Sequence, residues 1–211
     1  SIINELYYRA TVENNEDKLH LGSKRLEGKI RKLRDDYPWI TITDFGTRRR
    51  FSRGWQYYVI ERMAGQLPNQ FLGTSNVKAA MDQALLPMGT SAHEMHMVMS
   101  GVMHYDDDDI RASHGQTLQD WWALYGYGLS IALTDTYGTD FFFSDFNSVQ
   151  AANWKGLRHD SGDPIAFGEK AIAFYQRKGI DPREKMLIFS DGLDLPTIIR
   201  IAEQFKNRIK V

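Results

Sequence analysis

Hydrophobic residues recur along this chain with two different spacings, which predict helices at the start and short strands alternating with helices afterwards. An apolar helical pattern occupies residues 2–7, and a second one runs from Glu16 to Asp35 with lysines and arginines on its other faces. Pro38 ends this second helix, because the residue before a proline disfavours helical backbone angles. Residues 1–36 are therefore expected to form leading helices.

From residue 37 onwards, a unit of short strand, polar tip and helix repeats. The helix over Pro164–Lys178 is the clearest, because Asp163 can cap its first turn and Gly179 suits its exit. Strands that alternate with helices predict parallel β/α units. The expected strands are Trp39–Asp44, Gln70–Thr74, Leu86–Thr90, Leu129–Asp135, Gly156–Asp160, Lys185–Ser190 and Arg208–Val211.

Length and composition limit the domain organisation and the classes of function. No linker divides the 211 residues, so 1–211 is predicted to be a single domain, with leading helices over 1–36 and repeated units over 37–211. The 26 basic and 27 acidic side chains nearly cancel, which argues against a dedicated binder of nucleic acid or membrane surfaces. Cysteine is absent, and no apolar run approaches the ~20 residues of a membrane helix. A soluble cytoplasmic protein is expected.

Polar residues gather where each predicted strand ends. Because the carboxyl ends of parallel strands share one face of a barrel or one edge of an open sheet, these tips are expected to lie together. No single tip is specific, and each alone could simply turn the chain or cap a helix. The tips are Asp44-Phe45-Gly46-Thr47-Arg48, Gly73-Thr74-Ser75-Asn76, Gly89-Thr90-Ser91-Ala92-His93-Glu94, Thr134-Asp135-Thr136, Arg158-His159-Asp160-Ser161-Gly162-Asp163 and Ser190-Asp191-Gly192.

The side chains at these tips favour a phosphorylated sugar or nucleotide as substrate. Arginine and the backbone amides of Gly-Thr or Ser-Asp-Gly turns suit phosphate groups. The carboxylates of Asp135, Asp160 and Asp163 suit ribose hydroxyls or a Mg²⁺ ion carried by a diphosphate. A histidine among them suits proton or phosphoryl transfer.

Several other polar or sulfur-containing residues have a structural interpretation. His20, His104 and His114 lie in no supporting motif, and His93-Glu94-Met95-His96 is one residue short of the zinc-protease spacing. The run Asp106–Asp109 is expected in an exposed loop or helix start, because adjacent carboxylates repel each other. The methionines that follow His93 are expected to fill a helix core: Met95, Met97, Met99 and Met103.

Taken together, the tips over residues 40–195 resemble those of the nicotinate phosphoribosyltransferase family of type II phosphoribosyltransferases. The resemblance implies that nicotinate and 5-phosphoribosyl-1-diphosphate are joined to nicotinate mononucleotide, with release of pyrophosphate, in NAD salvage. It implies coupling to ATP hydrolysis through a phosphohistidine at His93. It also implies an irregular, TIM-like β/α barrel of parallel strands, truncated here at both ends, and a homodimer of the intact protein.

The resemblance also assigns roles to individual residues. Arg158 and Thr90 are expected to hold the pyridine carboxylate, while His93, Asp135 and Asp160 are expected to be catalytic. Mg²⁺ is the expected metal, with no residue directly assigned as its ligand. Further substrate-binding roles are expected for Arg48 at a phosphate, for Ser75 and Asp191 on the ribose or pyrophosphate side, and for Ser161.

Two parts of the family pattern have no match in this sequence. These are an amino-terminal aromatic residue that covers the nicotinate ring and a late glycine-rich phosphate loop, which is expected just after Val211. The chain is therefore expected to be about half of the usual protein, a single domain by length. Nicotinamide phosphoribosyltransferase, which shares much of the tip pattern, and a non-catalytic nucleotide-binding remnant are the alternatives.

Overall fold

The protein is described by a computed structural model that covers residues 2–11 and 15–211. The chain forms two compact units, residues 1–89 and residues 90–211, and each is described by itself. The interpretation of 1–211 as one catalytic domain stays a prediction.

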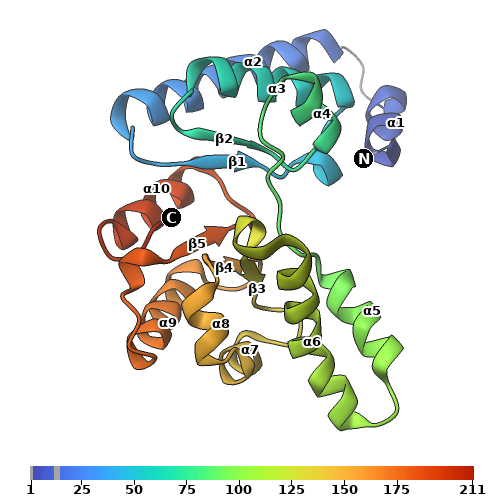
Figure 1. Ribbon diagram of the computed structural model, residues 1–211. Coiled ribbons are helices and arrows are strands. Elements are labelled where there is room, and N and C mark those ends of the chain that lie inside the picture. The colour runs from blue at the N-terminus through green and yellow to red at the C-terminus, as the bar shows by residue number, and fades with distance from the viewer. Residues whose placement is uncertain (1, 12–14) are drawn as a thin grey trace. The chain divides into compact units, whose positions relative to one another are not determined.

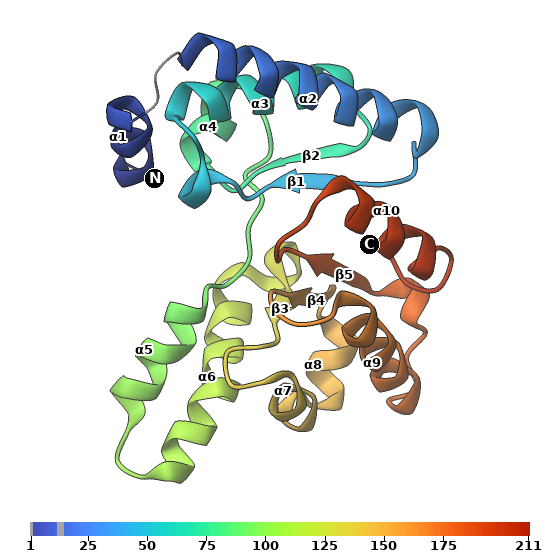
Figure 2. The ribbon, with the colours of Figure 1, turned by 180° about the vertical axis from the view of Figure 1, so that it is seen from behind.

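In the first unit, helices pack against a pair of parallel strands. β1 (Ile42–Asp44) pairs with β2 (Phe71–Thr74), with Ile42 opposite Phe71, and a single bridge joins Thr74 to Pro87. Figures 1 and 2 show α2 (Asn15–Asp36) and α3 (Arg53–Gln66) lying along this pair. The unit also contains α1 (Ile2–Thr11), the 3₁₀-helix η1 (Thr47–Arg49) and α4 (Val77–Asp82).

The buried face of α2 follows from its sequence spacing. Leu26, Ile30 and Leu33 recur at helical intervals and are buried, as is Ile60 on α3. The buried side-chain amide of Gln70 donates to the carbonyl oxygen of Leu33 in the last turns of α2 at 3.3 Å, and to those of Tyr37 and Ile40 just beyond the helix, each at 3.0 Å. A helix end buried in this way needs such a donor, which explains why a polar residue is buried here.

The second unit is built on three parallel strands in the order β3 (Ile131–Leu133), β4 (Gly156–His159) and β5 (Met186–Phe189). Neighbours in the sheet are neighbours in sequence, as expected for successive β/α units. Lys210 bridges to Met186 beyond β5, in the same parallel sense. The helical elements are α5 (His93–Met103), α6 (Asp107–Tyr125), η2 (Gly126–Leu129), α7 (Thr139–Asp145), α8 (Ser148–Asn153), α9 (Pro164–Arg177), η3 (Pro182–Glu184) and α10 (Leu195–Phe205).

Aromatic and aliphatic side chains from the sheet and from α7 to α10 form the core of the second unit. The Phe189 ring stacks on that of Phe205, and Phe167 packs against Phe189 edge to face. Gly168 on α9 allows this packing, since a Cβ there would lie 2.1 Å from the Phe205 ring. Gly156 is needed in the sheet for the same reason, because its Cβ would lie 1.8 Å from the Met186 carbonyl oxygen.

The predicted helices and most of the predicted strands are present. α9 begins as expected, with Pro164 in its first turn and the Asp163 side chain accepting a hydrogen bond from the Ala166 amide. Asp106 caps α6 at the start of the acidic run. The strands expected over Leu86–Thr90 and Arg208–Val211 are reduced to single bridges at Pro87 and Lys210, and Met97 is exposed rather than part of a core.

The parallel β/α character of the predicted fold is confirmed, whereas a closed barrel is not formed by the described strands. They make one sheet of two strands and one of three. Within the same residues, no helix is both long and apolar enough to cross a membrane.

Candidate active site

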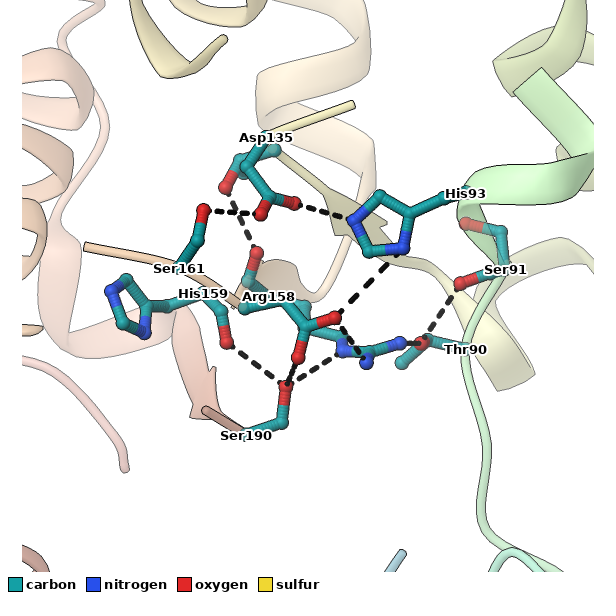
Figure 3. Close-up of polar contacts among 10 residues, drawn as sticks. Thr90, Ser91, His93, Asp135, Arg158, His159, Ser161 and Ser190 are labelled. Carbon is teal, nitrogen blue, oxygen red and sulfur yellow. Dashed lines mark hydrogen bonds and ion pairs between the residues drawn. The ribbon is translucent and has the colours of Figure 1, made fainter. Parts of the chain in front are cut away.

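A network of polar side chains lies at the carboxyl ends of β3, β4 and β5 and at the start of α5. Figure 3 shows His93, Asp135, Arg158, Ser161 and Ser190 pointing toward one another. They come from four of the predicted tips, with Arg158 and Ser161 sharing the one that follows β4, as the predicted parallel topology requires. Thr90 and Asp160 complete this group.

Arg158, near the end of β4, is the centre of the network. Its Nη1 donates to the Thr90 hydroxyl at 2.8 Å, and its Nε donates to the Ser190 hydroxyl at 2.9 Å. Its Nη2 lies 2.9 Å from Asp160 Oδ2. A guanidinium group is planar and always charged, so these three contacts hold a fixed positive charge at one place.

Asp160 is the carboxylate that balances this charge. Its Oδ1 accepts a hydrogen bond from the Ser190 hydroxyl at 2.6 Å. Desolvation acts to raise the pKa of Asp160, but the Ser190 hydroxyl and the Arg158 guanidinium outweigh it and keep the pKa below its usual range. Asp160 is therefore ionised at neutral pH.

His93 is the first residue of α5, and its ring is held by Asp135. The Nε2 atom lies 3.0 Å from Asp135 Oδ1, while the Ser161 hydroxyl donates to Oδ2 of the same carboxylate at 2.5 Å. Because a carboxylate only accepts hydrogen bonds, Nε2 carries the ring proton in this arrangement. The second nitrogen, Nδ1, lies 3.9 Å from Asp160 Oδ2, which is too long for a hydrogen bond. The lone pair of the neutral ring is therefore on Nδ1.

Three further tip residues lie at the ends of β4 and β5. Gly162 has a φ of 85°, a backbone angle that glycine adopts readily, and it follows Ser161 in the turn. His159 is buried between the rings of Phe167 and Phe189, and this burial lowers its pKa. Asp191 is exposed in the turn after β5, and its role at the site stays a prediction.

Two predicted site residues, Arg48 and Ser75, belong to the first unit. Arg48 is exposed in η1, and Ser75 follows β2, where its amide donates to the Asp44 carbonyl oxygen at 2.8 Å. Their roles stay predictions.

A second polar network supports the tips of β1 and β2. Asp44 Oδ2 accepts hydrogen bonds from the Gln56 amide at 2.8 Å and from the Thr74 hydroxyl at 2.7 Å. The same amide lies 2.9 Å from the Thr47 hydroxyl, and Gln56 Oε1 accepts from Asn76 at 3.1 Å. Gln56 is buried, and its hydrogen bonds join the tip of β1 to the tip of β2.

The described residues offer no preformed protein cage for a metal ion. No group of three or more histidine, aspartate or glutamate side chains among residues 2–11 and 15–211 is arranged to hold one. The carboxylates of Asp135 and Asp160 are nevertheless the hard oxygen donors that Mg²⁺ accepts, and Mg²⁺ commonly keeps waters and substrate phosphates as its other ligands. The donor set thus fits an ion that arrives with a diphosphate.

Two features of this region were not expected from the sequence. Ser190, quoted only as part of a tip, bonds both Arg158 and Asp160. His114 and His96 form a buried stacked pair behind His93, with ring centroids 5.3 Å apart. The spacing of His96 from His93 placed it inside α5, but nothing in the sequence indicated its partner on α6.

Comparison with known proteins identifies the family. The model of the nicotinate phosphoribosyltransferase (NAPRTase) family matches residues 40–211. A nicotinate phosphoribosyltransferase from Chromobacterium violaceum is 42% identical over 219 residues, which cover 100% of this chain and 53% of that protein.

Solved structures agree with this match. The crystal structure of nicotinate phosphoribosyltransferase from Porphyromonas gingivalis superimposes with a TM-score of 0.88 at 33% identity, over 99% of this chain and 51% of that one. The corresponding structure from Vibrio cholerae gives a TM-score of 0.88 at 36% identity, over 99% and 49%. The chain spans about half the length of these relatives. It belongs to the nicotinate phosphoribosyltransferase family.

Proposed function

We propose that the protein containing this chain is a nicotinate phosphoribosyltransferase that acts in NAD salvage. The observation that carries the proposal is the position of the Arg158 guanidinium, which bonds Thr90, Ser190 and Asp160 beside a histidine oriented by Asp135. A fixed cation next to an oriented imidazole suits an anionic substrate and a group transfer. The family membership supports the same activity.

Nicotinate is a planar ring that carries a carboxylate, and Arg158 and Thr90 are its proposed binding residues. A guanidinium fork can donate two parallel hydrogen bonds to a carboxylate, which fixes the plane of the ring. The Thr90 hydroxyl lies within hydrogen-bond distance of the same guanidinium, so both residues are proposed to bind the carboxylate end of nicotinate.

In the proposed reaction, the ring nitrogen of nicotinate attacks C1 of the ribose of 5-phosphoribosyl-1-diphosphate. The new bond joins this nitrogen to C1, while the bond from C1 to the diphosphate oxygen breaks and pyrophosphate leaves with the electron pair. Positive charge develops on the sugar, and the carboxylates of Asp135 and Asp160 are proposed to stabilise it. Both are mostly shielded from water, which strengthens that effect.

His93 is proposed to couple this reaction to ATP hydrolysis. Its Nδ1 carries the lone pair, because Nε2 donates to Asp135. Attack of Nδ1 on the terminal phosphorus of ATP would form a phosphorus–nitrogen bond and release ADP, and water would later break that bond and return free phosphate. The added negative charge would sit beside Arg158 and Asp160 and would change the affinity for the sugar diphosphate.

A Mg²⁺ ion bound here together with the diphosphate would supply positive charge that offsets the charge of the leaving group. Asp135 and Asp160 are the residues that would hold it. Arg48 is proposed at a phosphate, Ser75 and Asp191 on the ribose or pyrophosphate side, and Ser161 at the substrate. The intact protein is proposed to close the β/α barrel and to assemble as a homodimer.

A preference for nicotinate over nicotinamide would distinguish the proposed function from the first alternative, a nicotinamide phosphoribosyltransferase. The Arg158 cation favours a substrate carboxylate over a neutral amide, since hydrogen bonds between charged partners are roughly twice as strong. Competition between the two pyridines for limiting 5-phosphoribosyl-1-diphosphate tests this directly. Excess of nicotinamide mononucleotide among the products would reject the proposal, and the absence of any mononucleotide would favour the non-catalytic remnant.

The role of His93 is tested by the variants His93→Gln and His104→Gln. His104 lies exposed just beyond the end of α5, so it serves as a matched control on the same helical hairpin. Replacement of His93 should abolish ATP hydrolysis that depends on nicotinate, whereas replacement of His104 should leave it unchanged. Unchanged coupling in His93→Gln would contradict the proposed mechanism.

A further inference from the structure

The segment between β3 and α7 contacts α5 at two of its residues. Asp135 bonds the His93 ring, as described above. Two residues later, the Tyr137 hydroxyl donates to the backbone carbonyl oxygen of His96 at 2.9 Å. The first contact holds a side chain, while the second holds the helix backbone, so the segment restrains α5 as well as the ring that α5 carries.

The Tyr137 hydroxyl is part of a wider set of hydroxyl contacts. It is hydrogen-bonded to the Ser100 hydroxyl, one turn further along α5. Ser100 also bonds the Ser113 hydroxyl at 2.9 Å, and Ser113 lies on α6. Tyr137 is thus linked to both helices of the α5–α6 hairpin, which lie side by side in Figures 1 and 2.

A buried histidine pair also packs against this part of α5, and its His114 ring lies edge to face with the Tyr137 ring. The His96 ring is fully buried and stacks on His114, whose Nδ1 lies 2.5 Å from Asp145 Oδ2 at the end of α7. Burial, together with the nearby His114 and His93, lowers the pKa of His96 to about 4, so this ring is neutral at pH 7. Neither nitrogen of His96 bonds a residue that the structure describes. Its ring therefore contributes packing, and the side-chain hydrogen bonds at this residue go to its carbonyl oxygen, from the Tyr137 hydroxyl at 2.9 Å and from the Ser100 hydroxyl at 3.1 Å.

We propose that Tyr137 is a positioning residue for His93. His93 and His96 are the first and fourth residues of α5, so the carbonyl group held by Tyr137 lies about one helical turn from the histidine. A helical turn is stiff, and fixing its carbonyl group therefore fixes the start of the helix. Asp135 and Tyr137 belong to one short segment, and His93 and His96 belong to one helical turn. The hydrogen bond from Tyr137 to His96 therefore holds the segment and the helix at the separation that the bond between His93 and Asp135 needs.

The expected consequence concerns the ring proton of His93. With Tyr137 in place, the ring stays at the distance at which Nε2 donates to Asp135, and a single tautomer is populated. Without the hydroxyl, α5 gains freedom at its start, the bond to Asp135 is made for a smaller fraction of the time, and the second tautomer appears. Arg158 and Thr90 have no hydrogen bond with Tyr137, so affinity for the pyridine carboxylate should not change.

The test compares Tyr137→Phe with Tyr105→Phe. Both variants lose one hydroxyl group, and Tyr105 is 92% exposed at the tip of the same hairpin. Long-range ¹H–¹⁵N spectra of histidine-labelled protein report the tautomer of His93, whose signals are assigned with His93→Gln. We expect one Nε2–H tautomer in the wild type and in Tyr105→Phe, and a mixture in Tyr137→Phe. A wild-type pattern in Tyr137→Phe, or the same mixture in Tyr105→Phe, would overturn the proposal.

A kinetic measurement adds a readout that simple destabilisation would not move. This part rests on the proposed function. We expect Tyr137→Phe to slow phosphate transfer to His93 about three- to tenfold, the effect of one hydrogen bond, with an unchanged KM for nicotinate. An altered tautomer in a protein that transfers no phosphate would reject the proposed function and retain the positioning role.

A second variant keeps the proposal testable if Tyr137→Phe does not fold. Ser100→Ala removes the hydroxyl partner of Tyr137 on α5 and leaves the aromatic ring in place. It should shift the His93 signals in the same direction and to a smaller extent. An unchanged spectrum of folded Ser100→Ala would then count against the proposal.

Discussion

The Thr90 hydroxyl accepts a hydrogen bond from Arg158 at 2.8 Å, although the two residues are 68 positions apart in the sequence. Thr90 precedes α5 and Arg158 lies on β4, so the contact depends on the packing of the whole second unit. The family resemblance assigns both Arg158 and Thr90 to the pyridine carboxylate of the substrate. Their contact places the two side chains close enough to bind that one group together.

Arg158→Lys should weaken nicotinate binding. Lysine keeps the positive charge but loses the planar fork, so it cannot replace the bonds to Thr90, Ser190 and Asp160 together. Loss of a charged hydrogen bond costs about 1.5–3 kcal/mol, which corresponds to a rise in KM for nicotinate of roughly tenfold or more. Initial rates at varied nicotinate concentration measure the change. Arg183→Lys, at an exposed surface pair with Asp181, is the control and should behave as the wild type.

The sequence was sufficient to predict the local elements around this site. α9 could be placed because Asp163, Pro164 and the apolar face of the helix all carry local signals. The tips could be grouped because parallel strands place their carboxyl ends together. Both inferences depend only on residues that are close in sequence or on a general rule of topology.

Features that depend on packing between distant segments could not be predicted in the same way. The pairing of His96 with His114 requires α5 and α6 to meet at one particular angle, and neither residue carries a motif. The residues around Pro87 have the composition of a strand, but only a single bridge to Thr74 forms. Met97 has the composition of a core residue and yet lies exposed.

Asp135→Asn should impair His93 without removing it. An asparagine can present its amide group to Nε2, which would favour the tautomer with the proton on Nδ1 and take the lone pair away from that atom. We expect phosphate transfer to His93 to fall by at least tenfold, as measured by acid-labile label from γ-labelled ATP. Asp140→Asn tests the same change of charge at an exposed site, and its label should equal that of the wild type. Full labelling of Asp135→Asn would contradict the assignment of Nδ1.

His96→Phe should flatten the dependence of stability on pH. The pKa of His96 falls from 6.5 to about 4 on folding, so between these values the unfolded chain binds the extra proton. Stability is therefore lost as the pH decreases through this window. The histidine accounts for about 2 kcal/mol of the difference in unfolding free energy between pH 7 and pH 5.

Urea unfolding of His96→Phe at both pH values measures this contribution. The variant should lose less stability than the wild type between pH 7 and pH 5, while His104→Phe, at an exposed position, should follow the wild type. An equal loss in His96→Phe and wild type would show that His96 takes up its proton equally in both states.

Two glycine substitutions should have opposite effects on stability. In Gly168→Ala the new methyl group would meet the Phe205 ring, and such overpacking costs about 1–3 kcal/mol. In Gly101→Ala, on α5, nothing lies within 4 Å of the new Cβ, and alanine in a helix gains about 0.5–1 kcal/mol over glycine. Thermal unfolding followed by circular dichroism distinguishes the two. A Gly168→Ala protein as stable as Gly101→Ala would contradict the described contact between α9 and α10.

The most direct test of the central claim is the release of pyrophosphate by the protein in the presence of 5-phosphoribosyl-1-diphosphate, Mg²⁺ and ATP. We expect release that depends on nicotinate, exceeds that with nicotinamide, and falls sharply in Arg158→Lys. No release, or release that is equal with and without nicotinate, would contradict the assignment of Arg158 and Thr90 as the nicotinate site.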